Sequence, residues 1–254
     1  MRYLDKIFPG VLIVFMSIST LLADQKMPGV TGVATAAGAR GTIDLALRLH
    51  PDTSAVAVIA GESQIEKDWL AAVHAELLGL EDKVREIDLI GSPGSQMIER
   101  VAALPPHTVA LFQMIPQEAN HPAIGVYDVL AAATQHVPTY SVFERLALDH
   151  GGIGGAYYDP AIEPLLAGQI AARLPSGEHV GNIPVVHDPY FRSAWIWRQL
   201  QRWHIPASAV PPGSVVLHRD PSLWESYRKY ILATVVLIVA QALLIIGRAK
   251  NASG

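Results

Sequence analysis

Apolar and polar residues alternate along most of this chain in blocks whose lengths predict strands and helices in turn. The run SAVAVIAG at 54–61 is short, continuous and apolar, which is typical of a strand buried in a parallel sheet. The next segment, SQIEKDWLAAVHAELLGL at 63–80, repeats its apolar residues with helical spacing, and Ser63 and Glu66 stand where a capping box needs them. A strand followed by a helix is the repeating unit of an α/β fold.

The same alternation continues on both sides of this unit. Further strands are predicted at 83–91, 108–115, 138–143, 183–186 and 214–220, and helices at 41–50, 95–104, 123–136, 160–174 and 191–205, while residues 221–230 lead into the apolar run near the C-terminus. Strand and helix units of this length imply parallel sheets with helices on both faces and right-handed crossovers.

An uncharged apolar run, YILATVVLIVAQALLIIG, occupies residues 230–247 near the C-terminus. At about 1.5 Å per residue, a helix of this length just crosses a hydrocarbon core of about 30 Å. Arg228 and Lys229 precede the run, and Arg248 and Lys250 follow it. The pattern predicts a transmembrane helix, and the alternative is a buried helix of a soluble core.

A second apolar stretch, residues 7–23, lies near the N-terminus after Arg2 and Lys6. One interpretation is a signal peptide with a basic start and an apolar centre. The other is a buried strand at 11–18 that begins after a Pro-Gly turn. We favour the strand because of the family resemblance described below.

Composition narrows the class of protein. The chain has 254 residues, of which 50% are apolar and 17% charged, so it can bury the core of one two-lobed domain or of two small ones. Its net charge of -4 offers no basic stripe for nucleic acid. The absence of cysteine excludes disulfides and thiolate metal sites and is compatible with an oxidising periplasm.

Motifs of catalysis and cofactor binding are missing from the sequence. The turn GSPGS at 91–95 is neither a nucleophile elbow nor a phosphate loop, and GVTGVATAAG at 29–38 lacks the spacing of a dinucleotide-binding loop. The ten histidines form no H-x-x-x-H or H-x-H pattern, so a metal site would need residues that are distant in sequence to converge. We expect His74 to be a surface or half-buried histidine, and we predict no catalytic residue, no metal and no cofactor.

Candidate binding residues follow from the geometry of parallel sheets, in which ligands lie beyond the carboxyl ends of the strands. Polar residues at or directly after the ends of predicted strands are Ser17, Glu62, Ser63, Gln113 and Tyr140. Each has a structural alternative, as Ser63 shows by its position as a helix cap. The glycine-rich segment 149–160 adds Tyr158, whose ring would stack on a ligand if the glycines let the backbone approach one; the alternative is a close approach to another strand.

Several segments together resemble a known family. They are FPGVLIVFMSI (8–18), PGVTGV (28–33), RGTIDLALRLHPDTSAVAVIAG (40–61), ESQIEKDWL (62–70), IPVVHDPYFRSAWIWRQLQRWHIP (183–206) and above all PPGSVVLHRDPSLWESYRKYIL (211–232). The chain resembles the periplasmic-binding-protein type I fold of ABC-transporter substrate-binding proteins, in the version that forms the extracytoplasmic sensor of some membrane histidine kinases.

The resemblance implies an α/β fold of two lobes with parallel sheets, joined by a hinge, with a small organic ligand in the cleft. The expected division is a remnant of an incomplete first lobe (1–52), a second ligand-binding lobe (53–182), a return to the first lobe with a juxtamembrane helix (183–229), a transmembrane helix (230–247) and a cytoplasmic tail (248–254). Relatives begin earlier and, as kinases, continue further, so we expect a sensor truncated at both ends.

The expected function is therefore small-molecule sensing in a two-component signal transduction system, without enzyme activity in this chain. Its globular part would lie in the periplasm and its helix in the bacterial inner membrane. The expected partners are a small organic ligand, the lipid bilayer and a second copy of the chain through the juxtamembrane and transmembrane helices. The alternative is the solute-binding component of an ABC transporter. We prefer the sensor because transporter-type binding proteins are usually anchored at the N-terminus or diffuse freely.

Overall fold

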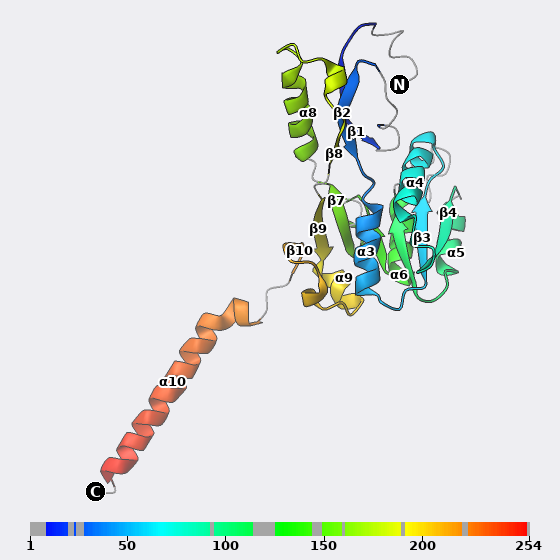
Figure 1. Cartoon of the computed structure of the whole chain (residues 1–254). Coiled ribbons are helices and arrows are strands. Elements are labelled where there is room, and N and C mark those ends of the chain that lie inside the picture. Colours follow the sequence, from blue (N-terminus) through cyan, green and yellow to red (C-terminus); the bar gives the residue numbers. More distant parts are fainter. Residues whose placement is uncertain are drawn as a thin grey trace. The chain divides into compact units, whose positions relative to one another are not determined.

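A computed structural model describes residues 9–19, 23, 28–91, 94–113, 125–143, 149–158, 161–188, 191–219 and 223–252 of the chain. The chain divides into two compact units, Met1–Leu217 and His218–Gly254. The first unit carries three sheets, and the second carries the helix α10 (Leu223–Ala252) (Figure 1). Each unit is described by itself.

A four-stranded parallel sheet forms the centre of the first unit. Its strands are β3 (Ala55–Ala60), β4 (Arg85–Ile90), β5 (Thr108–Phe112) and β6 (Thr139–Ser141), in the order β4-β3-β5-β6. All six residues of β3 are buried, as the continuous apolar run predicts for a strand covered on both faces. The predicted α/β class with a parallel sheet is confirmed.

Helices cover both faces of this sheet because successive strand side chains point in opposite directions. Val56 and Val58 of β3 lie in one apolar cluster together with residues of α3 (Ala39–Leu49) and α4 (Gln64–Leu77). Ala57 and Ile59 lie in a second cluster with residues of α5 (Gly94–Ala102) and α6 (Val126–His136). The alternation along one strand thus fixes two packed layers.

A second sheet is made of β7 (Gly154–Tyr158), β9 (Phe191–Ile196) and β10 (Val215–Leu217), in the order β10-β9-β7. Strands β7 and β9 are antiparallel, whereas β9 and β10 are parallel. The helix predicted over 191–205 is wrong in its first part: residues 191–196 are a strand, and the helix α9 is only Trp197–Arg202. Ala194, Trp195 and Ile196 are all buried, which a strand between two neighbours allows.

Close backbone contact explains the glycines of β7. A side chain on Gly154 would collide with the carbonyl oxygen of Ala194 in β9, and one on Gly155 would collide with that of Ser141 in β6. Of the two interpretations of the glycine-rich segment, the structure shows the approach of one strand to another. Ile153 continues this link, because its N–H donates to the carbonyl of Thr139 at 2.8 Å.

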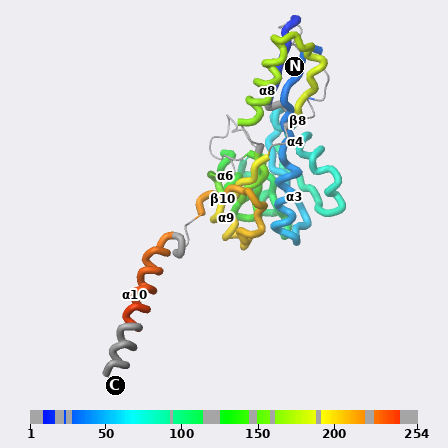
Figure 2. The backbone as a smooth tube through the Cα atoms, turned by 60° about the vertical axis from the view of Figure 1, so that its left-hand side comes forward, coloured from blue at the N-terminus to red at the C-terminus, as the bar shows by residue number. Residues whose placement is uncertain are grey.

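The third sheet has the order β1-β2-β8, with β1 (Ile13–Ser19), β2 (Val30–Thr35) and β8 (Val186–Asp188), all parallel. The strand predicted at 11–18 is therefore present, and the one predicted at 183–186 lies slightly later. Helix α8 (Ile162–Arg173) packs against this sheet through Ile170, which clusters with Val33 and Ile183. Figures 1 and 2 both show α8 beside β8.

The packing divides the residues differently from the predicted boundaries. Helix α8 was expected in the second lobe (53–182), but it contacts β1 and β2. Conversely, α3 was expected in the first-lobe remnant, yet its residues Ile43 and Ala46 lie in the cluster that covers the four-stranded sheet. Each helix packs against the sheet that its apolar face contacts, and the order of the elements along the chain does not predict which sheet that is.

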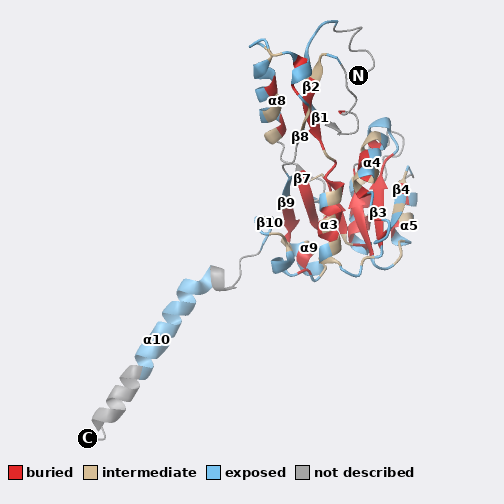
Figure 3. Cartoon of the chain, viewed as in Figure 1, coloured by how far each residue is buried: buried red, intermediate tan, exposed pale blue. Residues whose placement is uncertain are grey.

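Helix α10 is 30 residues long, and the side chains described in it, residues 226–242, are exposed (Figure 3). Among the described residues, no helix is long and apolar enough to cross a membrane. The predicted transmembrane span 230–247 extends past Ala242, and the side chains beyond that residue lie outside the described part of the chain.

Candidate ligand-binding site

The carboxyl ends of the four central strands meet at one edge of their sheet. Ala60 of β3 pairs with Ile90 of β4, and Phe112 of β5 pairs with both Ile59 and Ser141. The residues that directly follow the first three strands at this edge are Gly61-Glu62-Ser63, Gly91 and Gln113. The structure therefore brings Glu62, Ser63 and Gln113 to the same edge, and their contact with a ligand stays a prediction.

Gln113 is the most informative residue at this edge. Its backbone N–H donates to the carbonyl oxygen of Ile59 at 2.8 Å, which continues the sheet by one residue. Its side chain is only 2% exposed, and within the described residues neither its Oε1 nor its Nε2 has a hydrogen-bond partner. A buried polar group without a partner costs about 1–3 kcal/mol, so the amide is a group that a polar ligand would satisfy.

Glu62 brings a negative charge to the end of β3. Its side chain lies against Gly91, where the backbone adopts a φ of 59° and an added Cβ would come within 2.5 Å of the carboxylate oxygen Oε2. The left-handed backbone at position 91 favours glycine, and a larger residue there would displace the flexible side chain of Glu62. Glu62 itself is exposed and available to a ligand.

Ser63 acts as the helix cap that its position predicts. Its Oγ accepts from the backbone N–H of Glu66 at 3.4 Å, and its own N–H donates to Oε2 of Glu66 at 2.8 Å. The other carboxylate oxygen of Glu66 is buried and has no partner in the described structure. Sequence reasoning assigned Glu66 only to the cap and missed this free oxygen, which lies against Gly61.

Tyr140 does not join the residues at the carboxyl edge. It is fully buried in the middle of β6, its hydroxyl lies 2.9 Å from Nε2 of His50, and its ring meets Trp195 edge-on at 6.4 Å. Burial raises the pKa of Tyr140 far above the ordinary range, so its hydroxyl stays protonated. Ser141 ends the strand instead, and its Oγ accepts from the N–H of Phe143 at 3.0 Å.

Two predicted residues cannot be compared with this edge. Ser17 belongs to β1 and Tyr158 to β7, but the side chains of both lie outside the described part of the chain.

A cavity of about 400 Å³ opens at the opposite, amino end of the same strands. His50, Asp52, His107, His136 and Trp203 are among its lining residues. The hydrogen bond from the His107 side chain lowers the pKa of Asp52, and burial lowers the pKa of His50. Because ligands of parallel sheets lie at the carboxyl ends, we assign the candidate site to the edge with Gln113 and not to this cavity.

No protein-family model matches the sequence, and no curated protein matches it significantly. Solved structures do match its fold. A conserved domain protein from Vibrio cholerae has a TM-score of 0.62 at 12% identity, covering 83% of this chain and 73% of that one. The ABC domain from Streptococcus pneumoniae in complex with L-Trp has a TM-score of 0.62 at 14% identity, with 82% and 72% covered.

A third match is the ligand-free, open structure of a substrate-binding protein with adhesive properties from Clostridium difficile. Its TM-score is 0.62 at 12% identity, and the match covers 82% of this chain and 71% of that one. The matching structures are of the periplasmic-binding-protein type I and ABC solute-binding kind, and this chain shares their α/β arrangement with parallel sheets. At these identities the likeness concerns the fold.

Proposed function

We propose that this chain binds a small organic solute at the carboxyl edge of its four-stranded sheet, as the solute-binding component of an ABC transporter does. The observation that carries the proposal is the buried amide of Gln113, which has no partner within the described residues. The fold supports it, since substrate-binding proteins share this arrangement. The proposal assigns no catalytic step to the chain.

The chemistry of the edge favours a ligand with hydrogen-bond donors and a positive charge. Glu62 supplies an exposed carboxylate, and Gln113 supplies an NH2 group with two N–H donors and a carbonyl oxygen that accepts. An amino acid carries both a cationic ammonium group and polar groups of this kind. The structure of the Streptococcus protein holds L-Trp, which makes amino acids the first ligands to test.

The test is a thermal-shift survey of the full chain with the common amino acids and monosaccharides, followed by calorimetry of each hit. We compare the wild type with Gln113→Leu and with Gln96→Leu, a matched change of an exposed glutamine in α5. Gln113→Leu removes an unsatisfied buried amide, so it should leave the stability equal or higher while weakening ligand binding at least about tenfold. Gln96→Leu should change neither. Equal affinity of both variants, or no hit among these solutes, would contradict the proposal.

The proposed location of the globular unit is the periplasm, with residues 230–247 as a membrane anchor. The uncharged run supports the anchor, as do the exposed apolar side chains of Leu232, Val236 and Val239 in α10. An arginine at the centre of a membrane span costs about 2.5–3.5 kcal/mol. Val239→Arg should therefore release the chain from membranes that are washed with carbonate. The control Ser226→Arg, which lies outside the apolar run, should leave the chain in the membrane. Release of the wild type by the same wash would disprove the anchor.

The second candidate function is small-molecule sensing as the extracytoplasmic sensor part of a two-component histidine kinase. It is supported by the order of elements, in which α10 follows β10 directly and would lead from the ligand-binding unit into a membrane. Because the chain has no cysteine, Ser226→Cys gives a single probe of pairing between two copies. A sensor predicts disulfide cross-linking that changes with ligand, and a transporter component predicts none.

A further inference from the structure

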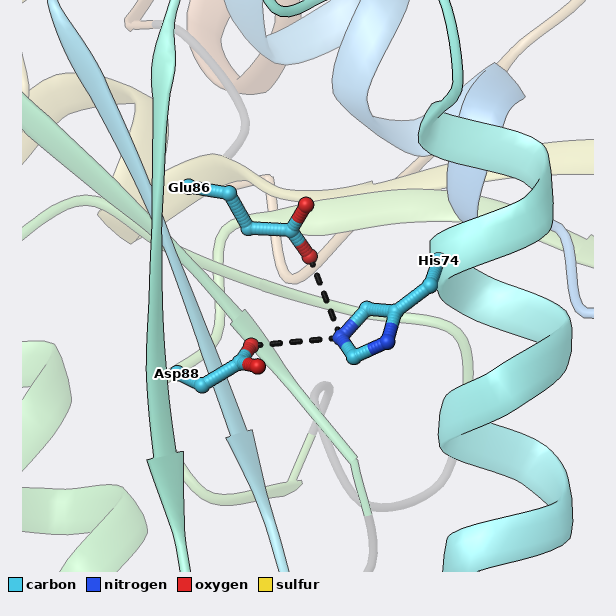
Figure 4. A group of neighbouring side chains, drawn as sticks. All are labelled: His74, Glu86 and Asp88. Carbon is cyan, nitrogen blue, oxygen red and sulfur yellow. Dashed lines mark hydrogen bonds and ion pairs between the residues drawn. The ribbon is translucent and has the colours of Figure 1, made fainter.

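Three side chains that can bind metal ions converge on β4, an edge strand of the four-stranded sheet. Glu86 and Asp88 are two residues apart on β4, so both point to the same face, and His74 reaches them from α4. Nε2 of His74 lies 3.2 Å from Oε1 of Glu86 and 3.2 Å from Oδ1 of Asp88 (Figure 4). One ligand atom from each residue lies within 4.8 Å of the other two.

These separations match the geometry of a small transition-metal ion. Zinc holds nitrogen at about 2.0–2.1 Å and carboxylate oxygen at about 2.0–2.2 Å in a tetrahedron. Two ligands of such a tetrahedron lie about 3.4 Å apart, close to the observed 3.2 Å from nitrogen to each oxygen. A small closure of flexible side chains would complete the set.

A hydrogen-bond explanation leaves this cluster only partly satisfied. Nε2 of His74 carries at most one hydrogen, yet it faces two carboxylates at the same distance. Within the described residues, neither Glu86 nor Asp88 forms an ion pair with lysine or arginine. Two neighbouring carboxylates repel each other, and one divalent cation would neutralise both.

The cluster is also accessible. All three side chains are 39% exposed, so an ion can enter and water can fill the remaining coordination positions. Glu86 also lines a cavity of about 310 Å³ between the end of α4 and the start of β4. The cluster lies on other residues than the edge with Gln113, so it is independent of the proposed solute site.

We propose that His74, Glu86 and Asp88 form a binding site for one divalent transition-metal ion, with Zn²⁺ as the best fit. The imidazole nitrogen selects zinc and its neighbours in the transition series over Mg²⁺ and Ca²⁺, which prefer sets of oxygen ligands. The bound ion joins the helix α4 to the edge strand β4 and thereby stabilises the folded chain.

The test is calorimetric titration of the untagged full chain with Zn²⁺, together with Co²⁺ absorption spectra and thermal unfolding with and without Zn²⁺. The variants are Glu86→Gln, Asp88→Asn and His74→Ala, and the control is His136→Ala, which changes an exposed histidine of α6. The two amide variants keep the shape of the side chains, so circular dichroism should show an intact fold.

The wild type should bind about one Zn²⁺, unfold at a higher temperature with it, and show no comparable response to Mg²⁺ or Ca²⁺. Each of the three variants should weaken binding at least about tenfold, since even residues that only support metal ligands change affinity 10–100-fold. His136→Ala should bind like the wild type. Unchanged binding in the three variants, or equal loss in the control, would overturn the site, as would a wild type that binds no Zn²⁺.

Discussion

Strands β3 and β1 are both apolar, yet they differ in the number of paired neighbours and in burial. β3 has a partner on each side, and all six of its residues are buried. In the described part of the chain, β1 pairs only with β2, and Val11, Leu12 and Met16 in and before it are 54%, 49% and 48% exposed. An apolar run therefore predicts a strand, but the number of its neighbours decides how firmly the strand is held.

The largest expected effect of this difference is in amide hydrogen exchange. Residues 56–60 and 108–112 should exchange only through unfolding of the whole sheet, because both strands are buried and β3 is paired on both sides. Residues 13–18 should exchange orders of magnitude faster through local opening. The measurement is native-state exchange followed by mass spectrometry at two protein concentrations.

The concentration series serves as the control for self-association, because an open apolar edge can pair with a second chain. Slow exchange of 13–18 at high concentration only would indicate such pairing. Slow exchange equal to that of β3 in a proven monomer would show that the comparison of the two strands is mistaken.

Truncation of one side chain in each strand should give a smaller but clear difference in stability. Ile59 is fully buried, so Ile59→Ala should lower the free energy of unfolding by about 2–5 kcal/mol through lost contacts and the cavity left behind. Met16 in β1 is half exposed, so Met16→Ala should change the free energy of unfolding by about 0.5 kcal/mol or less. Denaturant unfolding measures both, and equal losses would remove the distinction between the strands.

The sequence predicted the four-stranded sheet well because local pattern and burial agree there. It failed at 191–196, where apolar residues such as Trp195 and Ile196 fit a helix or a strand, and pairing with β7 on one side and β10 on the other selects the strand. Tertiary partners decided between two patterns that the sequence allows equally.

The candidate site was predicted in part for a similar reason. Gln113 was found because it directly follows an apolar run, whereas Tyr140 lies within its strand and faces the core. The cluster of His74, Glu86 and Asp88 was missed because its members lie on separate elements, and only the packing of α4 beside β4 joins them. The alternation of Glu86 and Asp88 on a predicted strand was the one available signal.

The smallest expected effect is a pH dependence of the free energy of unfolding that arises from His50, the residue directly after α3. Burial lowers the pKa of His50, partly opposed by the charge of Asp52, while an unfolded histidine titrates near 6.5. As the pH falls below about 6.5, this histidine binds a proton in the unfolded chain while it stays neutral in the folded chain. The free energy of unfolding therefore falls by up to about 1.4 kcal/mol per pH unit.

His50→Gln keeps an acceptor for the Tyr140 hydroxyl and should reduce this pH dependence between pH 6.5 and the lowered pKa of His50. The control His136→Gln, at an exposed position, should retain more of the pH dependence than His50→Gln does. Urea unfolding at stepped pH values measures the slopes, and identical slopes for the wild type and His50→Gln would show that His50 titrates alike in the folded and unfolded chain.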